Sequence, residues 1–305
     1  MNDILITIAI PAYNNEKSIQ KTIDSCLKQQ TESAYEILIV DDASTDNTPE
    51  ILADYNDSKI RIVTLKERVP LIANHNICFK EAKGKYILFC HADDTLEEHA
   101  VRFFEYKLKQ RLYPEKYIVW GHSMFRDFSE KAIEQAGFTY NELVVGECAP
   151  LMFFYGGLTP SGTLYSRQSF IDMGGFLKVD MNSSPSDMTT MIFLAMHSFR
   201  FEMVDEMVLN RANSSTALSN ANIDVYLEEL DDAFKYFIEK TEKTQQAKLI
   251  NLATKQKNKP LYFFYAMAQS AQNRAQIKKL ILRHLVKYPW RLTHPLIQKI
   301  LNRIF

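Results

Sequence analysis

The sequence predicts an α/β fold, in which a mostly parallel sheet is flanked by helices and followed by a helical C-terminal region. Two observations carry this prediction. Apolar runs of strand length alternate with segments of helical spacing, and the early strands are apolar on both faces, as buried parallel strands are. The 305 residues are enough for one large domain or two smaller ones. We divide them at residues 110 and 220 into two halves of one α/β domain and a C-terminal region, 221–305.

The expected elements follow in chain order. The run ILITIAIP at 4–11 is a buried strand, and helical spacing then covers 15–29. The alternation continues with strands at 35–42, 61–65 and 85–90, a short helix that begins at Asp46 or Thr48, and a helix at 71–83. Later elements are strands at 117–121, 163–166 and 201–211, a loop at 154–162, and a helix that begins near Ser184. From about residue 223 the pattern is helical.

Polar residues follow three of the first four strands, at the edge where open parallel sheets bind ligands. The three strands end in PAYN at 11–14, DDASTD at 41–46 and HADD at 91–94. Because neighbouring carboxylates repel each other, this edge favours a divalent cation, Mg²⁺ or Mn²⁺, that carries a phosphate ligand. No glycine precedes Gly84, which excludes the glycine-rich phosphate loop of dinucleotide-binding folds.

The same residues also fit ordinary structural roles. Asp94, with Glu97 three residues later, fits a helix N-cap, and Asp46 fits another. The carboxylates at 41–42 could be turn residues alone, and His91 could be a hydrogen-bonded histidine instead of a metal ligand. A cap at Asp94 is compatible with a metal ion nearby.

Three segments of the first half carry a family resemblance. They are IAIPAYNNEKSI, IVDDASTDNT and ANHNICFKEAKGKYILFCHADD. In this order and spacing the chain resembles family-2 glycosyltransferases with the Rossmann-like GT-A fold. The resemblance is strong over 4–110, weaker over 155–215 and absent after about 220. It implies a nucleotide-sugar-binding half at 1–110 and an acceptor-binding half at 111–220.

The resemblance implies a role for each matching residue at the donor site. Pro11 and Tyr13 would belong to the nucleotide-binding segment, with Tyr13 stacked on the nucleobase. Asp41 or Asp42 would hydrogen-bond that base, usually a uracil. Asp93 would coordinate an Mn²⁺ or Mg²⁺ ion on the diphosphate.

Other matching positions raise the question of metal dependence. Asp94 would approach the donor sugar or the metal's second shell, and Arg211 would reach the diphosphate. His75 stands where the family usually has an arginine that faces the donor, and His91 replaces the first Asp of the D-x-D motif. The resemblance therefore implies a metal site at Asp93, while the two histidines leave the strictness of metal dependence open.

A weaker match in the second half concerns the catalytic base. GGF at 174–176 and PSDMTTMIFLAM at 185–196 resemble the family's G-G-F segment and its E-D-x-D-L helix. The resemblance places at Asp187 the base that an inverting transferase needs on the acceptor hydroxyl, with Ser186 in place of the usual Glu. The alternative is a plain helix start, with Ser184 as N-cap and Asp187 at N3.

The C-terminal region is basic and amphipathic. Residues 243–305 hold 13 Lys or Arg and no Asp or Glu, whereas the first 242 residues carry 23 against 37, a net charge of −14. Apolar stripes with basic flanks are typical of helices on anionic lipid, so we expect peripheral association with the inner face of the cell membrane. The alternative is packing on the acidic catalytic domain or on a second subunit. The N-terminus lacks signal-peptide features, which predicts a cytoplasmic protein, and no recognition motif suggests a nucleic-acid partner.

These expectations combine into one function. The chain should be an inverting glycosyltransferase that moves a hexose or N-acetylhexosamine from a nucleotide-diphosphate sugar, with UDP as the expected nucleotide, to a sugar hydroxyl of a glycan or lipid-linked acceptor. The departures at His75, His91 and Ser186 leave open a catalytically inactive GT-A domain that binds a nucleotide sugar or a partner protein. A nucleotidyltransferase is disfavoured, because its usual glycine- and arginine-rich first loop is missing.

Overall fold

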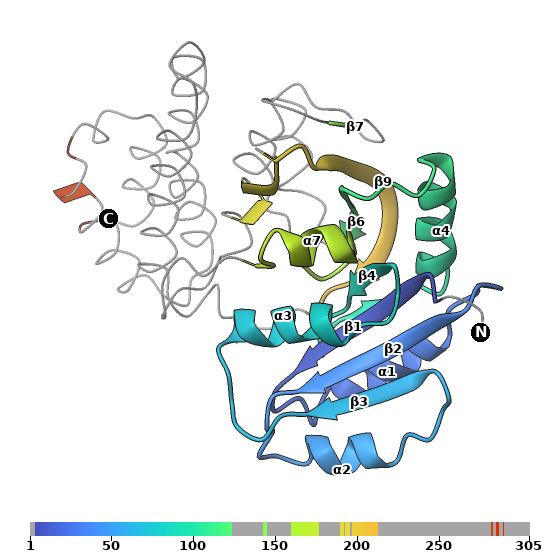
Figure 1. Ribbon diagram of the computed structural model, residues 1–305. Helices are drawn as coiled ribbons and strands as arrows, with labels where there is room; N and C mark the ends of the chain where they lie inside the picture. The colour runs from blue at the N-terminus through green and yellow to red at the C-terminus, as the bar shows by residue number, and fades with distance from the viewer. Residues whose placement is uncertain are drawn as a thin grey trace, which may run out of the picture. The chain divides into compact units, whose positions relative to one another are not determined.

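The computed structural model describes residues 4–123, 143–144, 160–176 and 190–212 apart from 192 and 196, together with four residues beyond 281 (Figure 1). The chain divides into two compact units, Met1–Ala217 and Leu218–Phe305. The basic helices expected in the C-terminal region fall outside the described residues, and the boundary expected at residue 110 stays a prediction. Among the helices that are described, none combines the length and apolar character needed to cross a membrane.

Four parallel strands form the first half of a nine-stranded sheet. In chain order they are β1 (Ile6–Ala12), β2 (Tyr35–Asp41), β3 (Ile60–Thr64) and β4 (Tyr86–Phe89). In the sheet the order is β3–β2–β1–β4, and the register places Ala12 of β1 beside Asp41 of β2. Because the four strands run in the same direction, their carboxyl ends meet at one edge.

The second half of the sheet is mixed. Its strands are β5 (Thr95–Leu96), β6 (Tyr117–Ser123), β7 (Leu143–Val144), β8 (Thr163–Ser166) and β9 (Arg200–Asn210). β8 runs antiparallel between β4 and β6, so β6 and its parallel partner β9 point the same way as β4. The short strands β5 and β7 pair antiparallel with β9. The predicted α/β fold is confirmed, and β9 brings its own carboxyl end to the edge formed by β1, β2 and β4.

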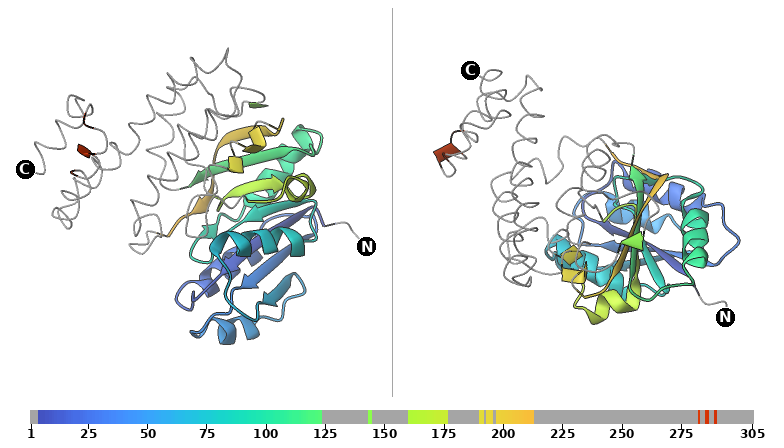
Figure 2. Two further views of the ribbon diagram at one scale, coloured as in Figure 1. Left: turned by 60° about the vertical axis from the view of Figure 1, so that its left-hand side comes forward. Right: turned by 90° about the horizontal axis from the view of Figure 1, so that it is seen from above.

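Helices cover both faces of the sheet (Figure 2). They are α1 (Ile19–Leu27), α2 (Thr48–Ala53), α3 (Leu71–Glu81), α4 (Ala100–Gln110) and α7 (Arg167–Asp172). α1 and α4 lie on one face, while α3 and α7 lie on the other. This arrangement explains why β1, β2 and β4 are apolar on both sides, since each side packs against helices.

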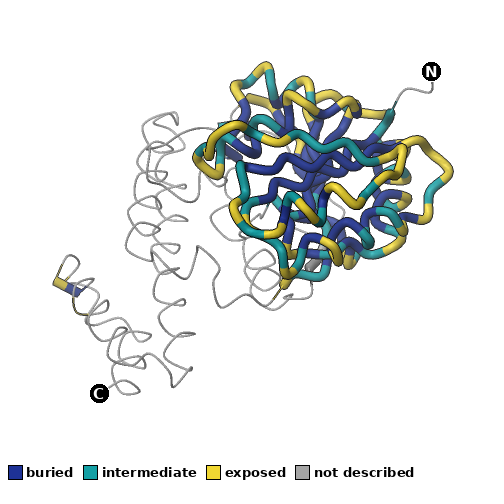
Figure 3. Tube along the Cα trace, turned by 90° about the horizontal axis from the view of Figure 1, so that it is seen from below, coloured by how far each residue is buried: buried dark blue, intermediate teal, exposed yellow. Residues whose placement is uncertain are grey.

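The core has a different character on each face of the sheet. On the α1 side, aliphatic residues dominate, among them Ile8, Ile39 and Ile23, all fully buried. On the α3 side the rings of Phe79 and Phe170 stack with centroids 4.2 Å apart, and they join Phe89, Tyr165 and Phe176 in an aromatic cluster. Figure 3 shows the strands as the buried centre of this unit. Two packed layers around the sheet hold its carboxyl edge in a fixed geometry.

The helix start expected at Asp94 is wrong. The segment after Asp94 is the strand β5, and α4 begins only at Ala100, with His99 as its N-cap residue. Both Asp94 oxygens are used elsewhere, as described below. The strand form is favoured because Thr95 and Leu96 pair with the end of β9, a long-range contact that local capping patterns do not reveal.

Candidate active site

The loops that follow β1 and β2 are tied together at the sheet edge. The Asn14 N–H donates to Ser44 Oγ (2.9 Å), and Asn14 Oδ1 accepts a hydrogen bond from the Thr45 N–H (2.8 Å). Asn14 and Ala43 both have a φ of +52°, a left-handed conformation that is uncommon outside glycine. Backbone of this kind is kept where surrounding contacts fix it, and it is concentrated at ligand sites.

Two buried carboxylates at the end of β2, Asp41 and Asp42, make different hydrogen bonds. Asp41 Oδ1 accepts hydrogen bonds from Ser44 Oγ (2.5 Å) and the Ser44 N–H (3.3 Å). Asp41 Oδ2 is buried and has no hydrogen-bond partner among the described residues. Asp42 accepts from the Val69 N–H (2.8 Å). Burial raises the pKa of Asp42, against the opposing effects of that hydrogen bond and of Arg68. Asp41 thus offers an unused acceptor, whereas Asp42 holds the loop before α3.

Tyr13 follows Ala12, the residue of β1 that pairs with Asp41, and its ring contacts the side chain of Arg68. The Arg68 guanidinium sits 4.0 Å from the centre of the Tyr13 ring, in cation–π contact. Arg68 is exposed, and its charge also acts on Asp42. Arg68 could not be predicted as a site residue, because it lies in a loop whose path depends on the hydrogen bond from the Val69 N–H to Asp42.

His75 and His91 form a hydrogen-bonded pair. His75 Nδ1 lies 2.9 Å from the Leu71 carbonyl oxygen, and His75 Nε2 lies 3.1 Å from His91 Nε2. Burial lowers the pKa of His75 to about 3 and the pKa of His91 to about 4, with the charge of Arg211 contributing to the second shift. Both imidazoles are therefore neutral at pH 7. The two histidines are the residues that replace the family's usual arginine and the first Asp of its D-x-D motif.

A turn at the end of β4 presents the remaining acidic residues. It runs from His91 to Asp94 and is closed by the Asp94 N–H, which donates to the His91 carbonyl (2.9 Å). Asp94 Oδ2 accepts from Ser161 Oγ (2.6 Å), and Asp94 Oδ1 accepts from the Ala212 N–H (3.0 Å). Asp94 thus connects the ends of β4, β8 and β9, and it holds the segment that carries Arg211.

Asp93 is the carboxylate of this turn with the clearest need for a cation. Asp93 is exposed, but partial desolvation raises the pKa of its carboxyl and the neighbouring charge of Asp94 raises it further, against the opposing effect of Arg211. A bound divalent ion would relieve this cost of ionisation. Among the described residues no group of three or more His, Cys, Asp or Glu side chains surrounds a common point. The residues present therefore fit an ion that takes most of its ligands from a bound diphosphate and water, as Mg²⁺ and Mn²⁺ do.

The structure brings together most of the residues predicted for the donor site. Pro11 ends up inside β1, and Tyr13, Asp41, Asp42, His75, Asp93, Asp94 and Arg211 line the carboxyl edge of the sheet or its immediate support. Ser186, Asp187 and most of the loop expected at 154–162 lie outside the described residues. Ser161 was missed as a site residue, because only the pairing of β8 with β4 brings it to Asp94 and to the His91 N–H (3.0 Å).

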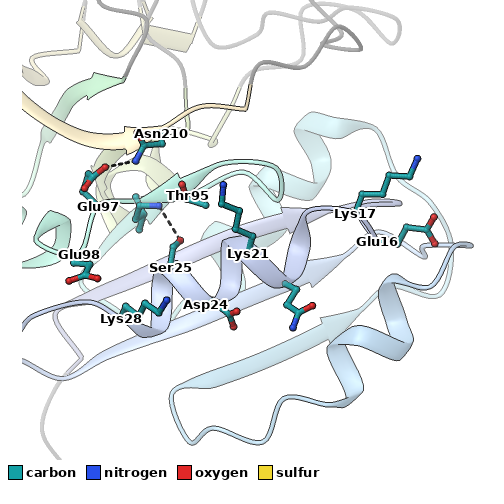
Figure 4. A pocket seen from close by; sticks show the side chains of 12 residues that line it. Glu16, Lys17, Lys21, Asp24, Ser25, Lys28, Thr95, Glu97, Glu98 and Asn210 are labelled. Atoms are coloured by element: carbon teal, nitrogen blue, oxygen red, sulfur yellow. Dashed lines mark hydrogen bonds between the residues drawn. The ribbon is translucent and has the colours of Figure 1, made fainter.

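A separate hollow of about 490 Å³ lies along α1 and β5 (Figure 4). Its lining mixes Lys17, Lys21 and Lys28 with carboxylates, and it includes Glu97, which accepts a hydrogen bond from Asn210 Nδ2. Mixed charges of this kind do not select one class of ligand. The sheet edge is the stronger candidate for the active site, because Asp41 Oδ2 has no hydrogen-bond partner in the described part of the chain and the loops there hold Asn14 and Ala43 at positive φ.

The comparison with known families agrees with this geometry. Residues 7–142 match the family described as "Glycosyl transferase family 2". Over 94 residues, 31% of this chain and 37% of the relative, the chain is 37% identical to UDP-Glc:alpha-D-GlcNAc-diphosphoundecaprenol beta-1,3-glucosyltransferase WfgD of Escherichia coli. Over 92 residues, 30% of this chain and 36% of the relative, it is 36% identical to the putative teichuronic acid biosynthesis glycosyltransferase TuaG of Bacillus subtilis. The chain thus spans little more than a third of the length of these curated relatives.

Solved structures share the fold at low sequence identity. The crystal structure of S. aureus TarS residues 1–349 in complex with UDP aligns with a TM-score of 0.56 and 19% identity, over 82% of this chain and 79% of that one. The mannosyltransferase PcManGT from Pyrobaculum calidifontis, in complex with GDP-Man and Mn²⁺, aligns with a TM-score of 0.59 and 19% identity, over 98% and 85%. These likenesses confirm the GT-A fold. The match over residues 7–142 and the acidic edge built by that segment support a family-2 glycosyltransferase.

Proposed function

We propose that the protein is an inverting glycosyltransferase that uses a UDP-sugar as donor. The observation that carries the proposal is the buried Asp41 carboxylate, whose Oδ2 has no hydrogen-bond partner among the described residues. Asp41 pairs with Ala12, the residue before Tyr13, within the segment that matches the family. An aromatic face next to a single unused acceptor suits a nucleobase that stacks and donates one N–H. Since Oδ2 is buried, the base reaches it only after a local rearrangement.

The free acceptor favours uracil over guanine. The edge of uracil presents one N–H donor, at N3, between two carbonyl groups. The edge of guanine presents two adjacent donors, which are best matched by both oxygens of a carboxylate. Asp41 Oδ1 already accepts two hydrogen bonds from Ser44, so Asp41 has one oxygen to offer. The relatives support the same nucleotide: TarS was solved with UDP and with UDP-GlcNAc, and WfgD is named for a UDP-Glc donor.

The remaining donor-site residues would bind the diphosphate. Arg211, at the end of β9, supplies a positive charge close to His91 and Asp93. Asp93 would hold the Mn²⁺ or Mg²⁺ ion, and that ion, when bound, neutralises charge on the diphosphate leaving group. Asp94 fixes the Arg211 segment through the Ala212 N–H, which makes Asp94 a positioning residue in this proposal.

The acceptor and the base are also proposed from the sequence and the relatives. WfgD is named for an acceptor that carries a diphosphoundecaprenol lipid, and TuaG for teichuronic acid synthesis. We propose a sugar hydroxyl of a glycan or of a lipid-linked sugar as the acceptor of a hexose or N-acetylhexosamine, with Asp187 as the base. The basic C-terminal region would bring the protein to an anionic membrane where such a lipid acceptor resides.

The experiment is a calorimetric titration of UDP into the protein in the presence of chelator and then of Mn²⁺, followed by a screen of UDP-sugars for turnover. We expect UDP to bind and Mn²⁺ to tighten the binding. Binding of GDP in preference to UDP would contradict the assignment of the donor. Tight binding of UDP-sugars with no turnover on any acceptor would instead favour a domain that has lost transfer, as the His75–His91 pair would allow.

Changing Asp41 to Asn should weaken UDP binding by about 10- to 100-fold. The amide keeps the shape of the side chain and can still accept from Ser44 through its oxygen, but it places an N–H₂ group where the free Oδ2 stands. A donor would then face the donor of uracil N3, and a hydrogen bond to a charged group is worth about 1.5–3 kcal/mol. Calorimetry measures the change, with circular dichroism as the check on folding. Unchanged UDP affinity in a folded Asp41→Asn protein would remove Asp41 from the base site.

A further inference from the structure

The His75–His91 pair has a defined direction of hydrogen bonding. His75 Nδ1 faces the Leu71 carbonyl at 2.9 Å, and a carbonyl oxygen can only accept, so this nitrogen carries the proton. His75 is 2% exposed and has no carboxylate among its hydrogen-bond partners, so a buried imidazolium is disfavoured and His75 Nε2 is left as an acceptor. The proton between the two rings therefore belongs to His91 Nε2, 3.1 Å away.

This direction leaves a lone pair on the other nitrogen of His91. A neutral imidazole that donates through Nε2–H has an unprotonated Nδ1. Histidines that bind metal ions almost always donate their second ring nitrogen to a fixed acceptor, which sets the tautomer and the orientation of the ring. Here the acceptor is His75, itself held by Leu71 and stacked on Phe89 with ring centroids 5.1 Å apart. The support that a metal-binding histidine needs is thus built behind His91.

The position of His91 also fits. His91 opens the turn whose third residue is Asp93, and the hydrogen bond from the Asp94 N–H to the His91 carbonyl closes that turn at 2.9 Å. The Cα atoms at the two ends of such a turn, here those of His91 and Asp94, lie within about 7 Å of each other, so His91 and Asp93 belong to one tight turn. The His91 N–H donates to Ser161 Oγ, which fixes the backbone of the same residue at 3.0 Å. Each oxygen of Asp94 already accepts a hydrogen bond, from Ser161 Oγ and from the Ala212 N–H, so the inference uses Asp93 as the carboxylate ligand.

We propose that His91 binds the diphosphate-linked cation through Nδ1, beside Asp93, so that the protein supplies one imidazole nitrogen and one carboxylate. The inference rests on the proposed function, since the diphosphate provides the other ligands. An imidazole ligand suits Mn²⁺ and later transition metals better than Mg²⁺, which prefers oxygen. With His91 in place of the family's aspartate, the metal ligand is an imidazole nitrogen instead of a carboxylate oxygen. His75 supports this ligand by accepting the hydrogen bond from His91 Nε2.

The experiment is electron spin-echo spectroscopy of Mn²⁺ bound to the full chain with UDP. Binding of UDP in chelator is measured first by calorimetry, and phosphorus coupling to Mn²⁺ then shows that the ion sits on the diphosphate. We expect an additional coupling to a directly bound nitrogen, and we expect its pattern to change when all seven histidines carry nitrogen-15. The His91→Ala protein should lose this coupling and keep the phosphorus coupling.

Matched variants separate the role of the ligand from that of its support. His91→Asp should also lose the nitrogen coupling, and it should lower the preference for Mn²⁺ over Mg²⁺. His75→Gln should keep the ring of His91 in place only partly, and we expect Mn²⁺ affinity to fall by about 10- to 100-fold, the usual effect of losing a partner behind a ligand. His99→Ala is the control, since His99 pairs with Glu206 (2.9 Å) and should change neither coupling.

Each other outcome has one meaning. Phosphorus coupling without a histidine nitrogen would overturn the role of His91 and leave the proposed function intact. A histidine nitrogen that persists in His91→Ala would also overturn it. If UDP bound but Mn²⁺ showed no phosphorus coupling, the metal site itself would be refuted, and His91 with it. If UDP did not bind at all, the proposed function would fail, and this inference would fail with it.

Discussion

Replacing Glu202 with alanine should destabilise the protein by about 3–5 kcal/mol, the usual cost of leaving buried charges without their partner. Glu202 lies on β9 and is fully buried. Its carboxylate pairs with Lys107 Nζ (2.5 Å) and accepts two hydrogen bonds from Arg111, from Nε at 2.9 Å and from one terminal nitrogen at 3.0 Å. The Tyr117 hydroxyl donates a third hydrogen bond (2.6 Å). Removal of Glu202 would take away the buried carboxylate that the Lys107 ammonium and the Arg111 guanidinium share.

A matched control comes from a surface pair. Glu81 and Arg61 approach to 3.4 Å, with Glu81 46% exposed, so Glu81→Ala should change stability by no more than about 1 kcal/mol. Urea denaturation measures both variants. A Glu202→Ala protein no less stable than Glu81→Ala would show that the buried cluster is not required for stability. A large loss would explain how β6, β9 and α4 stay joined behind the site.

The same cluster sets a pH dependence of stability. Burial alone would raise the pKa of Glu202, but hydrogen bonds from Arg111, Lys107 and Tyr117 outweigh burial and hold that pKa below its usual value. A carboxylate with a lowered pKa in the folded state stabilises the fold above its unfolded pKa of about 4.5, and the gain is lost as the pH falls through the lowered value. Acid unfolding of the wild type should therefore be steeper below pH 4.5 than that of Glu202→Gln.

The sheet and its carboxyl edge could be predicted from the sequence because their signals are local. Runs such as ILITIAIP and YEILIVDD are apolar on both faces, and their polar ends mark where the parallel strands stop. The fold rule for open sheets then brings Tyr13, Asp41 and Asp93 together without any knowledge of contacts. The helix start at Asp94 was wrong for the opposite reason, since β5 exists only through its pairing with β9.

The features that the sequence could not reveal all depend on long-range contacts. Ser161 meets Asp94 across 67 residues, and the Ala212 N–H meets it across 118. Two of the departures from the family pattern, His75 and His91, are separate in the sequence, but the structure joins them by one hydrogen bond. This hydrogen bond changes the interpretation of both substitutions. Two neutral imidazoles with a defined donor and acceptor form one structural unit, so the two histidines are not two independent losses of family residues.

Replacing Asp187 with asparagine should lower the rate of transfer by about 10²- to 10⁴-fold, the usual contribution of a general base. The described carboxylates near the edge are engaged in other hydrogen bonds. Asp41 accepts from Ser44 and Asp42 accepts from the Val69 N–H. Asp94 accepts from Ser161 and from the Ala212 N–H. Asp93 is assigned to the side of the diphosphate, opposite the attacking hydroxyl. The base is therefore expected from another segment, and the resemblance places it at Asp187.

The measurement is kcat for sugar transfer together with UDP affinity by calorimetry. Asp187→Asn should lower kcat while UDP affinity stays within about twofold, because the base acts on the acceptor and only in the transition state. Ser186→Ala is the matched control, since it changes the neighbouring residue without removing a carboxylate, and its rate should stay close to that of the wild type. If Asp187→Asn kept most of its activity, the segment at 184–187 would be a plain helix start, and the base would have to be sought elsewhere in the acceptor-binding half.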